Sequence, residues 1–233
     1  LEMRYELQRL HVETGSTFVY VTHDQMEAMT LATQICLINN GVLQQYDAPL
    51  TVYSKPNNLF VADFVGNPSI NFVEAKGIQQ GGSLELTIFN DQKATFIPSE
   101  PLNLAKWFES RDAEDATKTS ALKEKAAQKG YVEKGNKDEP FRYHIARVNE
   151  IDESLLEEPV LTNEDFVLGI RPEFIDITDG SVEGEIYGAM PTGMESTIKI
   201  RLDDYLLTGV VFGSTLFAIG SKVKLNIKGN DIL

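Results

Sequence analysis

One histidine stands where chemistry on a phosphate group would be possible. The β-branched and aromatic run Thr17–Val21 predicts a buried parallel strand, His23 follows it, and Asp24–Ala32 predicts a helix with an acidic N-terminus. In an open parallel sheet, ligands bind outside the carboxyl ends of the strands. A neutral imidazole at such a position can donate a hydrogen bond to a phosphate oxygen and orient an attacking water. A histidine that merely caps the following helix has the same pattern, so this segment alone leaves both interpretations open.

The elements around this histidine predict an α/β arrangement for the first 66 residues. Helix–strand alternation of this kind is typical of α/β folds. Cys36 lies in a short apolar strand, where we expect it to be buried as a small hydrophobic residue. The other predicted elements are a helix over Leu1–Val12 ended by Gly15, the strand Ile35–Ile38, a turn at 39–41, the strand Val42–Tyr46, and two short helices between Pro49 and Gly66.

Beyond Gly66-Asn67-Pro68 the pattern changes to short alternating strands separated by turns. Many short strands with Gly-rich turns predict a small barrel or sandwich, so we place a domain boundary near Gly66–Phe72. Residues 101–165 interrupt the pattern and predict an insertion outside the core, with an exposed helix over 112–129 and an acidic stretch over 155–165. The predicted strands are 83–89, 94–98, 166–170, 182–187, 196–202, 205–212 and 222–227.

Composition narrows the classes of partner. The formal net charge of −14 disfavours binding to nucleic acid, and no run approaches the ~20 apolar residues of a membrane helix, so direct membrane insertion is not expected. The single cysteine suits a reducing cytosol, and no signal peptide is recognisable. The sequence begins inside a helical pattern, which predicts that Leu1 is a fragment boundary.

The first 72 residues closely resemble a stretch of ABC-transporter ATPases that contains their switch histidine. The segment that ends this stretch, Gly66-Asn67-Pro68…Asn71-Phe72, is most similar to the carbohydrate-importer branch, typified by the maltose importer's ATPase. Three later segments resemble the regulatory domain of that branch more weakly. Insertion 101–165 has no counterpart in the resemblance. The resembling segments are 3–7, 10–11, 22–32, 38–41, 44–49, 52–56, 60–68 and 71–72, followed by 168–173, 191–195 and 217–220.

Three elements of the family are missing from this sequence. It has no Gly-x-x-x-x-Gly-Lys-Ser/Thr loop to cradle phosphates, no apolar strand ending in Asp-Glu, and no Leu-Ser-Gly-Gly-Gln signature. In the family all three precede the switch histidine. We therefore expect that this chain neither hydrolyses ATP nor holds a cofactor or metal by itself, and whether it counts as an enzyme depends on the longer parent.

The resemblance implies a complete picture for that parent. Residues 1–66 would be the C-terminal remnant of an ABC nucleotide-binding domain, and 67–233 a β-rich, OB-like regulatory and dimerisation domain carrying the partly helical insertion. The parent would bind ATP and Mg²⁺, with His23 contacting the terminal phosphate. It would pair as a homodimer and act in the cytoplasm on membrane permease subunits, importing a sugar or related solute.

Other candidates and one alternative function remain open. Arg171 and Glu173 flank Pro172 and form either a local ion pair or a regulatory contact surface, while His11 and His144 lack metal-ligand spacing. The alternative function is a free-standing protein that binds an oxyanion or sugar in its small barrel. Such a protein would have no use for the segment Thr22–Ala32, which favours the transport ATPase.

Overall fold

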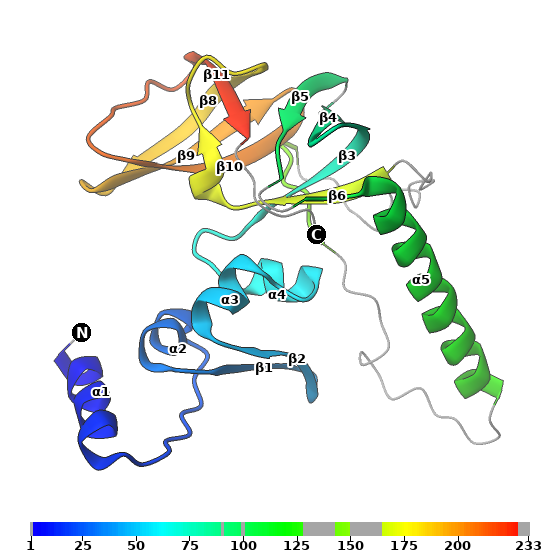
Figure 1. Ribbon diagram of the computed structural model, residues 1–233. Helices are drawn as coiled ribbons and strands as arrows, with labels where there is room; N and C mark the ends of the chain where they lie inside the picture. The colour runs from blue at the N-terminus through cyan, green and yellow to red at the C-terminus, as the bar shows by residue number, and fades with distance from the viewer. Residues whose placement is uncertain (1, 90, 99–100, 128–142, 150–164, 228–233) are drawn as a thin grey trace. The chain divides into compact units, whose positions relative to one another are not determined.

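The computed structural model describes residues 2–89, 91–98, 101–127, 143–149 and 165–227 (Figure 1). The chain divides into two compact units between Ile70 and Asn71, and each is considered by itself. Unit 1 holds the N-terminal residues to Ile70, and unit 2 begins at Asn71. No helix in the described ranges is long and apolar enough to cross a membrane.

Unit 1 consists of short helices and one antiparallel hairpin. Helix α1 ends at Gly15, whose φ of +61° is costly for residues with a side chain and whose N–H bonds to the His11 carbonyl oxygen at 3.1 Å. The hairpin turns at Asn40 and Gly41, both with positive φ as a two-residue turn requires. The elements are α1 (Glu2–Thr14), α2 (Gln25–Leu31), β1 (Ile35–Asn39), β2 (Val42–Asp47), α3 (Pro49–Ser54) and α4 (Leu59–Phe64).

Two predictions for unit 1 are wrong. Thr17–Val21 is irregular backbone rather than a buried strand, and Val19 and Val21 are 89% and 91% exposed. A strand needs neighbours for its backbone hydrogen bonds, and none of the described strands pairs with this segment. Cys36 is exposed, because β1 packs on one face only and Leu37, the next residue, takes the buried side.

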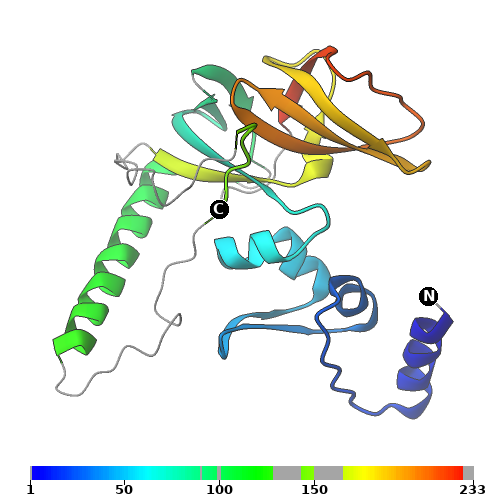
Figure 2. The ribbon, with the colours of Figure 1, turned by 180° about the vertical axis from the view of Figure 1, so that it is seen from behind.

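Unit 2 is β-rich, as predicted, and is built from two antiparallel sheets (Figures 1 and 2). The sheet orders are β5-β4-β3-β6 and β10-β9-β8-β11-β7. The first sheet contains β3 (Asn71–Gln80), β4 (Ser83–Ile88), β5 (Gln92–Phe96) and β6 (Asp165–Ile170), and the second β7 (Ile175–Asp176), β8 (Val182–Pro191), β9 (Glu195–Leu202), β10 (Tyr205–Phe212) and β11 (Lys222–Ile227). A 3-10 helix, η2 (Pro172–Phe174), leads into β7.

One apolar core joins the two sheets. Fully buried residues from the first sheet, including Leu84 and Leu168, lie in the same cluster as Ile186, Ile198 and Ile200 of the second. Burial of these side chains is the main force that holds unit 2 together.

A buried amide links the sheets. The Asn71 side chain, at the start of β3, donates to the carbonyl oxygens of Ile170 at 3.1 Å and Thr208 at 2.8 Å, and accepts from the Thr208 N–H at 2.7 Å. Ile170 ends β6, whereas Thr208 lies in β10. One side chain therefore satisfies backbone groups of both sheets.

Strands β3 and β7 and the early start of helix α5 were not predicted. Strand β3 lies in the middle of the first sheet although no strand was expected over 71–80. Helix α5 (Leu104–Ala127) begins eight residues before the predicted helix, and its first turns pack on the core, where Leu104 is buried. The expectation that the whole insertion lies outside the core is thus wrong at its start. Residues 128–129 of the predicted helix and 155–164 of the predicted acidic stretch lie outside the described residues.

Candidate functional site

His23 occupies a tight bend just before α2. Its side chain is exposed, and the backbone on either side is fixed by two local hydrogen bonds. The Asp24 N–H donates to Thr22 Oγ1 at 3.0 Å, and Asp24 Oδ1 accepts from the Glu27 N–H at 3.0 Å as the N-cap of the helix. The capping role that we considered for His23 therefore belongs to Asp24.

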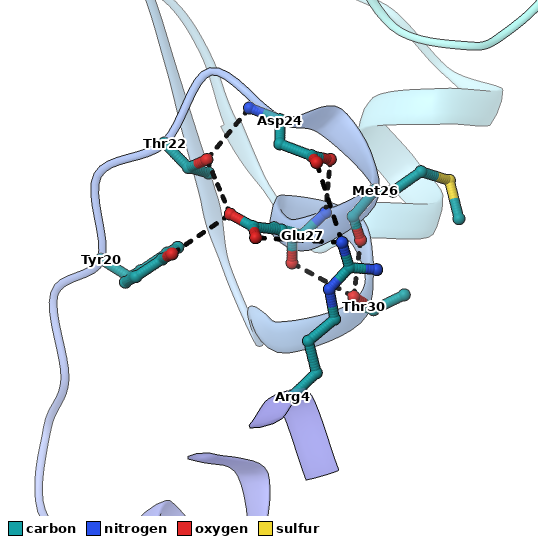
Figure 3. Close-up of polar contacts among 7 residues, drawn as sticks. All are labelled: Arg4, Tyr20, Thr22, Asp24, Met26, Glu27 and Thr30. Carbon is teal, nitrogen blue, oxygen red and sulfur yellow. Dashed lines mark hydrogen bonds and ion pairs between the residues drawn. The ribbon is translucent and has the colours of Figure 1, made fainter. Parts of the chain in front are cut away.

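Glu27 organises the polar contacts around this bend (Figure 3). Its Oε2 accepts hydrogen bonds from Thr22 Oγ1 at 2.9 Å and from the Tyr20 hydroxyl at 3.1 Å. From α1, Arg4 Nη2 lies 3.9 Å from Glu27 Oε1 and 3.7 Å from Asp24 Oδ2. One carboxylate thus connects the segment before His23 to the helix after it.

The hydrogen bond to Glu27 also affects the acidity of Tyr20. It raises the pKa of the Tyr20 phenol, and the negative charge of the same carboxylate adds to the effect. Tyr20 therefore stays a neutral donor at physiological pH.

Further contacts fix α2 within unit 1. The Gln25 side chain donates to the Phe64 carbonyl oxygen and accepts from the Gly66 N–H, the latter at 2.8 Å. On the other side, Gln8 of α1 donates to the Thr30 carbonyl oxygen at 2.6 Å. The bend that carries His23 is consequently supported both by α1 and by the end of α4.

This arrangement offers one exposed imidazole on a fixed bend. No group of three potential metal ligands occurs among the residues that the structure describes. A shallow hollow on α1, lined by Met3, Glu6, Leu7, Arg9, Leu10 and Glu13, contains none of the residues around His23. Chemistry at His23 would therefore need a ligand held mainly by other groups.

The remaining sequence candidates belong to other elements than this bend. Arg171 is buried directly before η2, and Glu173 lies within η2, both in unit 2. His11 is in unit 1, but its Nδ1 lies 2.9 Å from the Ser16 carbonyl oxygen and its ring packs edge-on against Phe18. The sequence did not identify Glu27 or Arg4 as residues of this site. Both lie in predicted helices, Arg4 before His23 and Glu27 directly after it, and these positions could have suggested them.

Comparison with known proteins finds relatives among the ATP-binding proteins of transporters. No protein-family model matches the chain. It is 43% identical over 88 residues to the osmoprotective compounds uptake ATP-binding protein GgtA of Synechocystis sp.. That alignment covers 38% of this chain and 24% of GgtA. Over an alignment of the same length and coverage, it is 48% identical to the lactose transport ATP-binding protein LacK of Rhizobium radiobacter.

A third relative gives a longer match. The ABC transporter ATP-binding protein YcjV of Escherichia coli O6:H1 is 43% identical over 108 residues, 44% of this chain and 29% of the relative. The chain thus spans 24–29% of the length of these curated relatives. Over the matched residues, the chain is a homologue of the ATP-binding proteins of ABC transporters.

Proposed function

We propose that this chain is the C-terminal part of the ATP-hydrolysing subunit of an ABC transporter that imports a sugar or a related solute. The observation that carries the proposal is its similarity to ATP-binding proteins whose names specify uptake of osmoprotectants, lactose and sn-glycerol-3-phosphate. Residues 1–66 are then the end of a nucleotide-binding domain, and 67–233 an OB-like regulatory and dimerisation domain with the insertion 101–165.

In this proposal His23 contacts the terminal phosphate of ATP. ATP is the substrate, and Mg²⁺, when bound, neutralises charge on its phosphates. Both would be held by parts of the subunit that this sequence lacks, because no phosphate-cradling loop occurs in it. What this chain provides is an imidazole at a fixed position, since Asp24 and Glu27 hold the bend while leaving the side chain of His23 exposed.

The partners follow from the same proposal. Two copies would pair as a homodimer and dock on membrane permease subunits, so that the protein works at the cytoplasmic face of the membrane without entering it. The support for it is that the matched relatives are named as an ABC transporter ATP-binding protein and a lactose transport ATP-binding protein.

Exposed apolar side chains at one end of unit 2 support the pairing. Met194 and Phe212 are 84% and 71% exposed, and their backbones are close in the fold, since the Gly213 N–H donates to the Met194 carbonyl oxygen at 2.9 Å. Leu216 is exposed nearby, where the Thr215 carbonyl oxygen accepts from Ser196 Oγ at 3.3 Å. We define Met194, Phe212 and Leu216 as the tip patch. Residues 207–210 of β10 are buried and cannot contribute to such a surface.

Sedimentation of the full chain tests the pairing. Unit 1 also exposes apolar residues, Val19 and Val21, that could associate non-specifically. The double variant Met194→Ser/Phe212→Ser should shift a dimer to monomer at tens of micromolar, whereas Val19→Ser/Val21→Ser should leave it paired. The reverse result would refute the tip patch as the pairing surface.

The function itself is tested by comparing the chain with its longer parent. The intact subunit assembled with permeases should hydrolyse ATP, and this chain alone should neither release phosphate nor bind ATP tightly in isothermal titration. Micromolar binding by the chain alone would contradict the proposal. The alternative of a free-standing oxyanion or sugar binder would instead predict binding of such a ligand to unit 2 in the same titration.

A further inference from the structure

The backbone on the two sides of His23 is joined by a short chain of hydrogen bonds. The Asp24 N–H donates to Thr22 Oγ1 at 3.0 Å, and Thr22 Oγ1 in turn donates to Glu27 Oε2 at 2.9 Å (Figure 3). Because the Thr22 hydroxyl directs its proton at the carboxylate, its lone pairs are free to accept from the Asp24 N–H. Bonds linked in this way polarise and strengthen one another. Glu27 therefore fixes the direction of the hydroxyl that closes the bend.

Glu27 holds this bend from both ends. Its carboxylate binds Thr22, the residue before His23, and its N–H donates to Asp24 Oδ1, on the residue after His23, at 3.0 Å. Its side chain is only 20% exposed, so its hydrogen bonds are better shielded from water than those of a fully solvated carboxylate. The backbone of His23 thus lies between two contacts of one residue.

Arg4 connects the two carboxylates of the bend to α1. Its Nη2 lies 3.7 Å from Asp24 Oδ2 and 3.9 Å from Glu27 Oε1, so one guanidinium faces both acids. A cation beside two carboxylates offsets their mutual repulsion, but both of these contacts are long and partly exposed. We therefore expect Arg4 to contribute less to the bend than the hydrogen bond between Thr22 and Glu27.

We propose that Glu27 and Thr22 are positioning residues for His23. The carboxylate orients the Thr22 hydroxyl, and the hydroxyl holds the Asp24 N–H, so that the imidazole is presented at one place. The inference rests on the proposed function, in which His23 contacts the terminal phosphate of ATP. Because displacement of a catalytic group by about 1 Å can cost about 100-fold in rate, loss of either side chain lowers kcat and leaves nucleotide binding nearly unchanged.

A double-mutant cycle in the intact subunit, assembled with its permeases, tests this role. Glu27→Ala should lower kcat about 10-fold or more with KM nearly unchanged, yet cost almost nothing further in a subunit that already carries His23→Ala. Equal losses in the two backgrounds, or near-normal turnover of Glu27→Ala, would overturn the proposal. The matched control is Glu13→Ala, which removes a carboxylate of α1 that lies 3.3 Å from Arg9 Nε and should leave turnover intact.

Conservative variants of Thr22 separate the hydrogen bond from packing. Thr22→Val nearly keeps the shape of the side chain but removes the hydroxyl, whereas Thr22→Ser keeps the hydroxyl. Thr22→Val should lower kcat as Glu27→Ala does, and Thr22→Ser should restore most of the rate. If Thr22→Ser is as slow as Thr22→Val, the methyl group rather than the hydroxyl matters and the proposal fails.

The chain itself offers a readout that needs no nucleotide. Backbone NMR relaxation should give the His23 N–H a lower order parameter in Glu27→Ala than in the unaltered chain, because the bend loses one of its two ties to Glu27. An unchanged order parameter would contradict the positioning role.

Failure of this inference differs from failure of the proposed function. A subunit with His23→Ala that hydrolyses ATP at a normal rate would overturn the proposed function and this inference with it. A slow His23→Ala subunit beside a Glu27→Ala subunit of normal rate would overturn the positioning role alone.

Discussion

Replacing Asn71 should destabilise unit 2 more than the small size of this side chain suggests. Its amide makes three hydrogen bonds, to the Ile170 carbonyl oxygen and to both backbone groups of Thr208, and its side chain is buried. Asn71→Ala leaves the Thr208 N–H and carbonyl oxygen without this partner in the interior. Because each buried group left unsatisfied costs about 1–3 kcal/mol, we expect a loss of about 3 kcal/mol. For a unit of this size that corresponds to about 6–12 °C in the thermal midpoint.

The charged variant separates hydrogen bonding from packing. Asn71→Asp keeps the shape, but an ionised carboxylate cannot donate to the carbonyl oxygens 3.1 and 2.8 Å away. Burial and these oxygens should raise the pKa of the introduced carboxyl above its unfolded value, so the destabilisation develops as pH rises through the interval between the two values. Asn71→Asp should thus differ less from the parent chain at pH 5 than at pH 8.

Denaturant unfolding followed by Trp107 fluorescence measures both variants. The matched control is Asn226→Ala in β11, whose side chain makes one longer hydrogen bond of 3.4 Å to Thr178 Oγ1. The reasoning fails if Asn71→Ala costs no more than this control, or if the Asn71→Asp difference does not depend on pH.

Three further predictions concern other parts of the chain. Burial, with the charge and hydrogen bond of Glu74, raises the pKa of Tyr143 to about 12, so the parent chain should lose stability relative to Tyr143→Phe between about pH 10 and 12, measured by denaturant unfolding across that range. Gly180→Ala should lower the thermal midpoint strongly, because its Cβ would lie 2.0 Å from the Leu225 carbonyl oxygen, whereas Gly82→Ala meets nothing within 4 Å and should leave the midpoint nearly unchanged. Asp24→Ala removes the cap of α2 and should cost about 1 kcal/mol, seen as faster amide exchange in α2; unchanged exchange would contradict the capping role.

Local signals account for most of what the sequence predicted correctly. The end of helix α1 could be predicted from Gly15, and the hairpin from the turn Asn40-Gly41. Seven strands of unit 2 could be predicted from their alternating apolar and polar residues. Strand β3 was missed because its core-facing side chains shrink along the strand, from Val73 to Ala75 to Gly77. The last must be small, since a Cβ there would lie 2.9 Å from Phe166 Cε1.

The errors arose where structure depends on distant partners. Thr17–Val21 has strong β-propensity, yet without paired neighbours in this chain it stays irregular and exposed. Val19, Val21 and Ile38 are all exposed. For the site, sequence could place His23 before a helix but could not show that Glu27 would bind both Tyr20 and Thr22.

The most direct test of the proposed function is the ATPase rate of the intact subunit, assembled with its permeases and carrying His23→Ala. If the imidazole acts on the terminal phosphate in the transition state, turnover should fall on the order of 100-fold or more while nucleotide binding stays nearly unchanged. The matched control, His144→Ala, alters a histidine of unit 2 and should leave turnover intact. A His23→Ala subunit with near-normal turnover would contradict the catalytic role.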